Sequence, residues 1–194
     1  MTSISTSAGS PARRKEIMDA ARALASASGW SAVTVRAVAA KIGCSAPALY
    51  QYFRDKEAIL AALAAEGRTQ LAEAMEASVA PVHGPGKRLR AALRGLWDFA
   101  MGNPELYAVM FGLDGLRGHG NSCGPAMQVL RQAVAELATK RDAAVVPEDW
   151  ADSLAAVAHG FIAQSLGGGF PGGAERALSL FMALVEDQTK ALGR

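Results

Sequence analysis

The sequence predicts an all-α protein of nine helices arranged in two domains. Apolar residues recur at the three- and four-residue spacing of a helix in nine segments, most of which are separated by glycine or proline. Of the 194 residues, 51% are hydrophobic but only 6% are aromatic, which suits alanine-rich packed helices. The predicted organisation is a disordered tail over residues 1–10, a three-helix domain over 11–56 and a helical domain over 57–194.

The first helix is predicted to begin at Ser10-Pro11 and to end near Gly29, because serine caps helices and proline fits the first helical turn. Its inward stripe is Ile17, Ala20, Ala21, Leu24 and Ser28. The opening turn is basic, although the helix dipole disfavours cations there unless an anion is near. Phosphate contact and a solvated basic tail are both consistent with this turn.

Residues 34–56 are predicted to form two short helices joined by a tight turn. Thr34 and Ser45 can each cap a helix, and Gly43 can end the first helix in the left-handed conformation. Leu49 and Phe53 lie on the packed side of the second helix. Such a unit is either a helix-turn-helix that enters the DNA major groove or an ordinary helical hairpin.

The charge distribution distinguishes the two predicted domains. Residues 1–56 hold eight Lys or Arg against three Asp or Glu, a net charge of +5, whereas the remaining residues hold twelve against fifteen. A basic end on an acidic body is typical of a protein that meets phosphates, and a solvated charged surface is the alternative.

Six helices are predicted after residue 56. Asp55 caps a long fourth helix that runs towards Pro81, and the fifth follows a break at 81–86 and ends at Gly102. The sixth covers 104–111, a glycine-rich loop covers 112–124, and the others cover 125–141, 148–166 and a segment after residue 173. Because the last two helices are apolar on two sides, we expect them to serve both the domain core and a subunit interface.

The motifs of residues 13–60 resemble those of the tetracycline-repressor (TetR) family of bacterial regulators. The resemblance rests on residues 29–39 and on residues 49–60, which read Leu-Tyr-Gln-Tyr-Phe-Arg-Asp-Lys-Glu-Ala-Ile-Leu. Trp150 with His159-Gly160 resembles the Trp/His-Gly class of C-terminal domains in this family. The resemblance implies double-stranded operator DNA as a partner and a homodimer formed by the last two helices. It also assigns phosphate contacts to Thr34, Ser45, Tyr50, Tyr52 and Lys56.

The side chains at the outward positions of the second short helix are expected to contact the bases. Those positions are Ala46, Pro47, Ala48 and Gln51. Gln51 can pair with adenine, and alanine or proline can meet a thymine methyl group. Arg36 can reach a base or a phosphate. Cys44 is expected to be a small buried hydrophobe.

A pocket for a small apolar effector is the second expected site. Its candidate lining residues are Trp97, Met101, Tyr107, Met110, Phe111, Met127 and His159, and simple core packing is the alternative for each. No catalytic residues are expected, because the three histidines are scattered and no nucleophile motif occurs. His119 and Cys123 lack a second ligand pair, so neither a metal nor another cofactor is predicted.

The expected location is the cytoplasm, and no membrane association is predicted. The N-terminus has no signal-peptide pattern, and no apolar run is long enough to span a membrane. The two cysteines, in segments of different character, imply no disulfide framework.

The sequence therefore predicts a dimeric transcriptional regulator rather than an enzyme. Its expected action is repression at a palindromic operator, relieved by a small apolar molecule. The alternative is a helical protein that binds a ligand or a partner without using its N-terminal domain for specific DNA binding.

Overall fold

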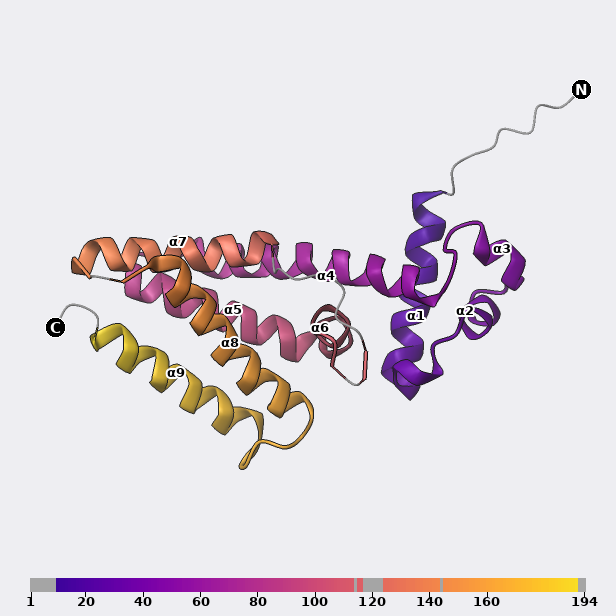
Figure 1. The fold of residues 1–194 in the computed structure, drawn as a ribbon. Helices are drawn as coiled ribbons and strands as arrows, with labels where there is room; N and C mark the ends of the chain where they lie inside the picture. Colours follow the sequence, from indigo (N-terminus) through magenta and orange to yellow (C-terminus); the bar gives the residue numbers. More distant parts are fainter. Residues whose placement is uncertain (1–9, 114, 117–123, 144, 192–194) are drawn as a thin grey trace, which may run out of the picture. The chain divides into compact units, whose positions relative to one another are not determined.

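Nine α-helices and one 3₁₀ turn make up the regular structure in the computed structural model, which describes residues 10–113, 115–116, 124–143 and 145–191 (Figure 1). No strand occurs within these ranges, which confirms the predicted all-α class. The elements are α1 Pro11–Ser28, η1 Trp30–Ala32, α2 Val35–Lys41, α3 Ala46–Tyr50, α4 Lys56–Val79, α5 Pro85–Gly102, α6 Pro104–Phe111, α7 Gly124–Arg141, α8 Pro147–Leu166 and α9 Gly173–Ala191.

The helices divide into two compact units. The first holds α1 to α3, the start of α4 up to residue 65, and α6. The second holds the rest of α4 together with α5, α7, α8 and α9. Each unit has its own buried apolar side chains.

Local capping fixes the ends of the short helices in the first unit. The Thr34 Oγ1 atom accepts a hydrogen bond from the Ala37 amide at 3.1 Å, and Ser45 Oγ accepts from the Ala48 amide at 3.3 Å. Gly43 adopts a φ of 66° in the turn between α2 and α3, a conformation that glycine reaches without steric cost. The predicted helix-turn-helix arrangement is confirmed.

Three details of the first unit differ from the prediction. The side chain of Ser10 makes no cap hydrogen bond, so α1 begins on Pro11 alone. Two residues of the predicted inward stripe of α1 are not buried: Leu24 is half-buried, and Ser28 is exposed because it is the last residue of the helix. Ala25, which was not predicted to face inward, is buried instead. Cys44 is half-buried rather than buried, because it lies in the connection between α2 and α3.

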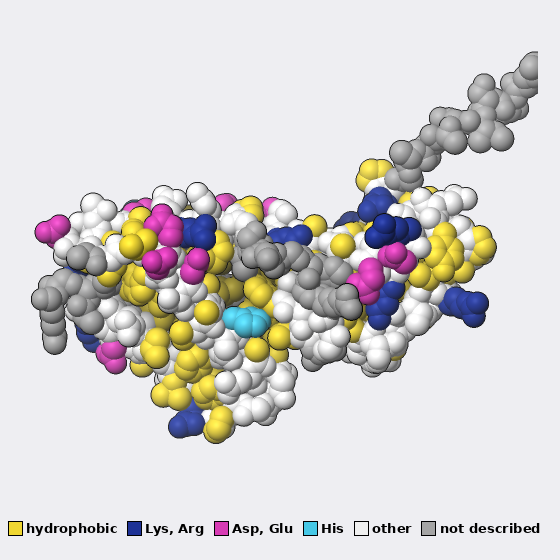
Figure 2. All heavy atoms as spheres, viewed as in Figure 1, with side chains coloured by type: hydrophobic (Ala, Val, Ile, Leu, Met, Phe, Trp, Pro, Cys, Tyr) yellow, Lys and Arg dark blue, Asp and Glu magenta, His cyan; other side chains and the backbone are white. Residues whose placement is uncertain are grey.

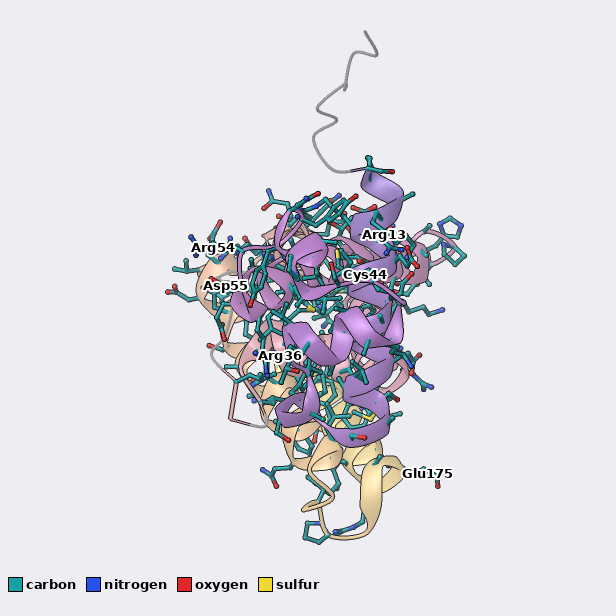
Figure 3. All side chains as sticks on the ribbon, turned by 90° about the vertical axis from the view of Figure 1, so that its right-hand side faces the viewer. Arg13, Arg36, Cys44, Arg54, Asp55 and Glu175 are labelled. Atoms are coloured by element: carbon teal, nitrogen blue, oxygen red, sulfur yellow. The ribbon has the colours of Figure 1, made fainter. Side chains whose placement is uncertain are left out.

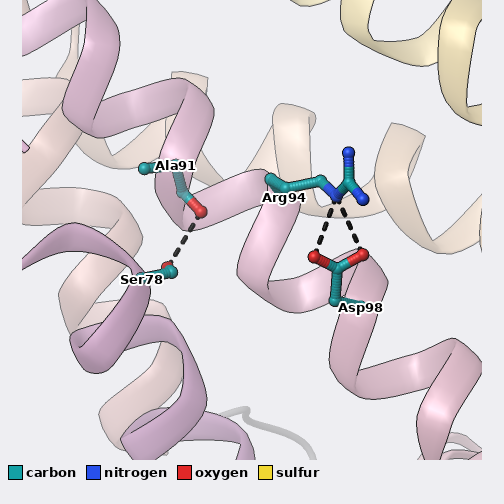
Figure 4. Close-up of polar contacts among 4 residues, drawn as sticks. All are labelled: Ser78, Ala91, Arg94 and Asp98. Atoms are coloured by element: carbon teal, nitrogen blue, oxygen red, sulfur yellow. Dashed lines mark hydrogen bonds and ion pairs between the residues drawn. The ribbon is translucent and has the colours of Figure 1, made fainter.

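In the second unit, a glycine lets α4 and α5 approach closely. A Cβ atom on Gly95 would lie 2.5 Å from Ser78 Oγ and 3.2 Å from the Met75 Cα, so a side chain does not fit. The Ser78 hydroxyl donates to the Ala91 carbonyl across this contact at 2.9 Å (Figure 4). The α5 helix begins at Pro85, so the break before it is shorter than predicted.

Helices α8 and α9 each bury one side and expose apolar side chains on another. Leu154, Ile162 and Phe181 are buried in the second unit, whereas Leu180 and Leu184 remain 44% and 38% exposed. Figure 2 shows hydrophobic side chains at the surface over these two helices. The two-sided character predicted for the last helices is therefore present in the structure.

Among the helices that the structure describes, none is both long and apolar enough to cross a lipid bilayer.

Candidate nucleic-acid interface

The α3 helix presents one buried and one exposed side. Leu49 and Phe53, just beyond its end, are 0% and 2% exposed and pack into the first unit. The opposite side exposes Pro47, Gln51 and Tyr50, the last of which is 53% accessible. Ala46 and Ala48 are half-buried, as is Tyr52 after the helix. This exposed side is narrow and carries Gln51 as its one amide side chain.

The two residues assigned to the helix starts also face solvent. Thr34 and Ser45 are exposed, and each side-chain oxygen accepts a backbone hydrogen bond. A hydroxyl engaged as an acceptor still has its own proton to donate. Each of them can therefore cap its helix and donate to a phosphate oxygen at the same time.

All three acidic residues of the predicted N-terminal domain are neutralised locally. Glu16 pairs with Arg13, Asp19 with Lys15 at 3.1 Å, and Asp55 with Arg54 at 3.1 Å. The hydrogen bond to Glu16 raises the pKa of Arg13. Arg54 and Asp55 lie together at one edge of the unit in Figure 3.

Five cations of this unit have no carboxylate partner among the described residues. They are Arg14, Arg22, Arg36, Lys41 and Lys56. Arg36, next to the cap of α2, is exposed. The excess positive charge counted in the sequence is thus available to phosphates instead of being cancelled within the unit.

Arg14 holds the chain that leaves α3. Its Nη1 atom donates to the Tyr52 carbonyl at 2.6 Å, and its guanidinium carbon lies 4.2 Å from the centroid of the Phe53 ring. The guanidinium group therefore satisfies a backbone acceptor beyond α3 and covers an aromatic face. This contact joins residues 38 positions apart, so helical spacing does not predict it.

Replacing Arg14 by lysine is expected to weaken DNA binding about fivefold, because lysine keeps the charge but lacks the planar guanidinium group that both donates to the Tyr52 carbonyl and lies over the Phe53 ring. The measurement is a DNA titration followed by fluorescence anisotropy, with Arg22→Lys on the same helix as the control. If Arg14→Lys binds like the wild type while Arg14→Ala is weak, Arg14 acts only as a charge and this positioning role is wrong.

Lys56 is already engaged within the protein. Its Nζ atom donates to the Trp30 carbonyl at 2.6 Å, which ties the start of α4 to η1. Asp55 caps the same helix as predicted, since its Oδ1 atom accepts from the Ala58 amide at 2.7 Å. An ammonium group has three donors, so two of them remain for a phosphate.

The seven residues predicted to line an effector pocket are divided between the two units. In the first unit, Tyr107 and Met110 are buried, and the Tyr107 ring centroid lies 4.4 Å from that of the half-buried Phe111. In the second unit, Trp97 is buried and stacks at 6.4 Å on the Phe181 ring. Met101, Met127 and His159 are half-buried.

His159 is partly shielded from water within the second unit. Burial lowers its pKa below the ordinary histidine value, so its imidazole is neutral near pH 7. A neutral imidazole can both donate and accept a hydrogen bond.

Two hollows of the second unit involve none of the seven residues. One, of about 590 Å³, lies against α4, α5 and α7, and the other, of about 320 Å³, lies against α5, α7 and α9. No group of three potential metal ligands occurs within the described ranges, and His119 and Cys123 lie outside them.

Two segments of the chain match models of a known protein family. Residues 17–63 match the model for bacterial regulatory proteins of the tetR family, and residues 89–188 match the tetracyclin repressor-like C-terminal domain. The chain belongs to the TetR family. The members of this family are transcriptional regulators rather than enzymes.

The named relatives of this TetR-family chain are described as HTH-type transcriptional regulators or repressors. It is 28% identical over 159 residues to the HTH-type transcriptional regulator BetI of Serratia proteamaculans, covering 72% of this chain and 80% of that protein. It is 41% identical over 61 residues to an HTH-type transcriptional repressor of Mycobacterium tuberculosis, covering 31% and 33% of the two chains.

Solved structures support the fold of this TetR-family chain. A protein of unknown function from Rhodococcus sp. RHA1 superposes with a TM-score of 0.79 at 23% identity, covering 99% of this chain and all of that one. The fatty acid degradation regulator FadR from Bacillus halodurans superposes with a TM-score of 0.75 at 14% identity, covering 91% and 95%.

Proposed function

We propose that this TetR-family regulator represses transcription by binding a palindromic operator as a homodimer, and that a small apolar molecule releases it. In this proposal residues 11–56 are the DNA-binding domain, and residues 57–194 bind the effector and form the dimer. The observation that carries the proposal is the exposed side of α3, with Tyr50 and Gln51 accessible, within residues 11–56, whose three acidic residues are all paired.

The DNA contacts fall into two classes. Positioning on phosphates is the role of residues with hydroxyl or ammonium donors at the helix starts and beyond α3. These are Thr34, Ser45, Tyr50, Tyr52 and Lys56. Sequence reading belongs to Gln51, Arg36 and the short side chains of Ala46, Pro47 and Ala48. With one amide on this side, specificity also depends on the shape of the DNA.

Dimerisation follows from the exposed apolar side of α8 and α9. Val157, Leu180 and Leu184 are each more than one-third exposed in the single chain. A second copy can cover these side chains through a self-complementary contact, which gives a four-helix interface with two-fold symmetry. Two copies of α3 then meet two half-sites of a palindrome.

The effector is proposed to be apolar or weakly polar. Trp97 and Phe181 form a buried aromatic pair in the second unit, and the half-buried, neutral His159 supplies a polar group that can select a hydroxyl or carbonyl. Tyr107, Met110 and Phe111 provide a second apolar group of side chains. Each of these sets is a candidate contact surface for the ligand.

Tyr50→Ala is expected to weaken operator binding about tenfold or more without lowering the melting temperature, because Tyr50 is exposed and its loss removes a phosphate contact. The measurement is a gel shift with the fragment upstream of the protein's own gene, at nanomolar protein. Lys56→Ala should also weaken binding, and it should in addition destabilise the first unit, because the hydrogen bond to the Trp30 carbonyl is lost.

Two results would contradict the proposal. The first is the absence of a shift on any genomic fragment at low salt. The second is equal affinity of wild type and Tyr50→Ala, which would favour a protein that uses its N-terminal domain for something other than specific DNA binding.

A further inference from the structure

A small cleft in the second unit gathers basic side chains from three helices. Its volume is about 320 Å³, and it lies at the start of α5 and the ends of α7 and α9. Its charged lining residues are Lys87, Arg90, Lys140, Arg141, Lys190 and Glu186. The sequence did not reveal this site, because the three segments are far apart along the chain.

The concentration of positive charge contrasts with the rest of the protein beyond residue 56. That part holds twelve Lys or Arg and fifteen Asp or Glu, and is therefore acidic as a whole. The cleft nevertheless collects five of those bases and a single acid. An ordinary solvated surface intersperses the two signs, so this local excess requires a separate explanation.

The one carboxylate is fully used by the cleft's own cations. Glu186 accepts from Lys190 Nζ at 2.9 Å and lies 3.6 Å from Arg90 Nη1. The hydrogen bond from Lys190, together with the charges of Lys190 and Arg90, lowers the pKa of Glu186, so it stays ionised. Its negative charge is thus already shared between these two neighbours.

Three exposed cations remain without a carboxylate partner among the described residues. They are Lys87, Lys140 and Arg141, which approach the same cleft from α5 and α7. Like charges held together repel one another, and an anion placed between them removes this repulsion. The free energy of such a site is therefore lowest when an anion occupies it.

We propose that this cleft binds a small molecule carrying two or more negative charges, either a phosphate compound or a polycarboxylate. A volume of about 320 Å³ is at the lower end of ligand pockets, which suits a compact ligand. Guanidinium and ammonium groups are the donors that recognise phosphate and carboxylate oxygens. This site is separate from the residues proposed above to contact an apolar effector.

The test uses pyrophosphate and citrate as probes of the two anion classes. Isothermal titration of the full chain at fixed ionic strength is expected to show saturable binding of one probe molecule per chain. Replacing Lys140 and Arg141 by glutamine should weaken that binding about tenfold or more, because two charged donors are lost. Lys87→Gln, on another helix, should weaken the same binding.

The matched control removes two arginines of the same unit outside the cleft. Arg94 pairs with Asp98 at 2.8 Å, and Arg176 donates to the Pro171 carbonyl at 2.7 Å (Figure 4 shows the first pair). Replacing both by glutamine removes two positive charges, as the double variant of Lys140 and Arg141 does, but should leave probe affinity unchanged. The same titration therefore separates a built site from general charge attraction.

Three results would overturn the proposal. They are no saturable binding of either probe, unchanged affinity in the variants of Lys87, Lys140 and Arg141, or an equal loss of affinity in the control variant. Binding of only one probe supports the proposal and identifies the anion class. Because the titration contains no DNA, its outcome does not depend on whether the protein is a repressor.

Discussion

Replacing Leu180 and Leu184 by glutamate is expected to dissociate the dimer and to lower operator affinity roughly 100-fold or more. Both side chains are exposed on α9 in the single chain, at 44% and 38%. A carboxylate buried against the apolar side of a second copy loses its hydration without gaining a partner, so the interface does not form. A monomer then contacts one half-site and loses the benefit of the second.

The control places the same two charges on another side of the same helix. Ser179 and Ala183 are exposed and have the same spacing as Leu180 and Leu184. Their double glutamate variant should remain dimeric in sedimentation velocity and should bind the operator like the wild type. If the variant of Leu180 and Leu184 is dimeric at micromolar concentration and keeps its affinity, the subunit interface lies elsewhere.

Leu49→Ala is expected to destabilise the N-terminal unit by about 2–5 kcal/mol, the usual cost of truncating a fully buried leucine. Leu49 is 0% exposed and is the buried residue of α3, so its loss leaves a cavity beneath this helix. Urea unfolding followed by the fluorescence of Trp30, which is buried in the same unit, measures the effect. The signals of Trp97 and Trp150 are removed by replacing both with phenylalanine.

Two neighbouring substitutions make this prediction specific. Leu49→Met keeps most of the volume and should cost less than about 1.5 kcal/mol. Tyr50→Ala, one residue later but exposed, should leave the urea midpoint almost unchanged while weakening DNA binding. A wild-type midpoint in Leu49→Ala would mean that α3 is not anchored through this side chain.

The features that the sequence predicted well are local. Thr34, Ser45 and Asp55 each cap a helix through a hydrogen bond to an amide three residues later, and such bonds depend on neighbouring residues only. The burial of Leu49 and Phe53 likewise follows from helical spacing.

The features that it missed depend on residues distant in sequence. The contact of Arg14 with the Tyr52 carbonyl and the bond from Lys56 to Trp30 required the tertiary structure. Helical spacing alone would place Leu154 and Val157, three positions apart in α8, on the same side. The structure divides them, because Leu154 packs inward whereas Val157 stays exposed.

In the proposed function, two copies of α2 and α3 read two half-sites of one operator. Selection from a pool of random duplexes, at a salt concentration that suppresses nonspecific binding, tests this arrangement. We expect the enriched sequences to form an inverted repeat that binds two chains per duplex, with enrichment reduced by Gln51→Ala. Equal recovery of all sequences, with binding that simply vanishes as salt rises, would contradict the claim.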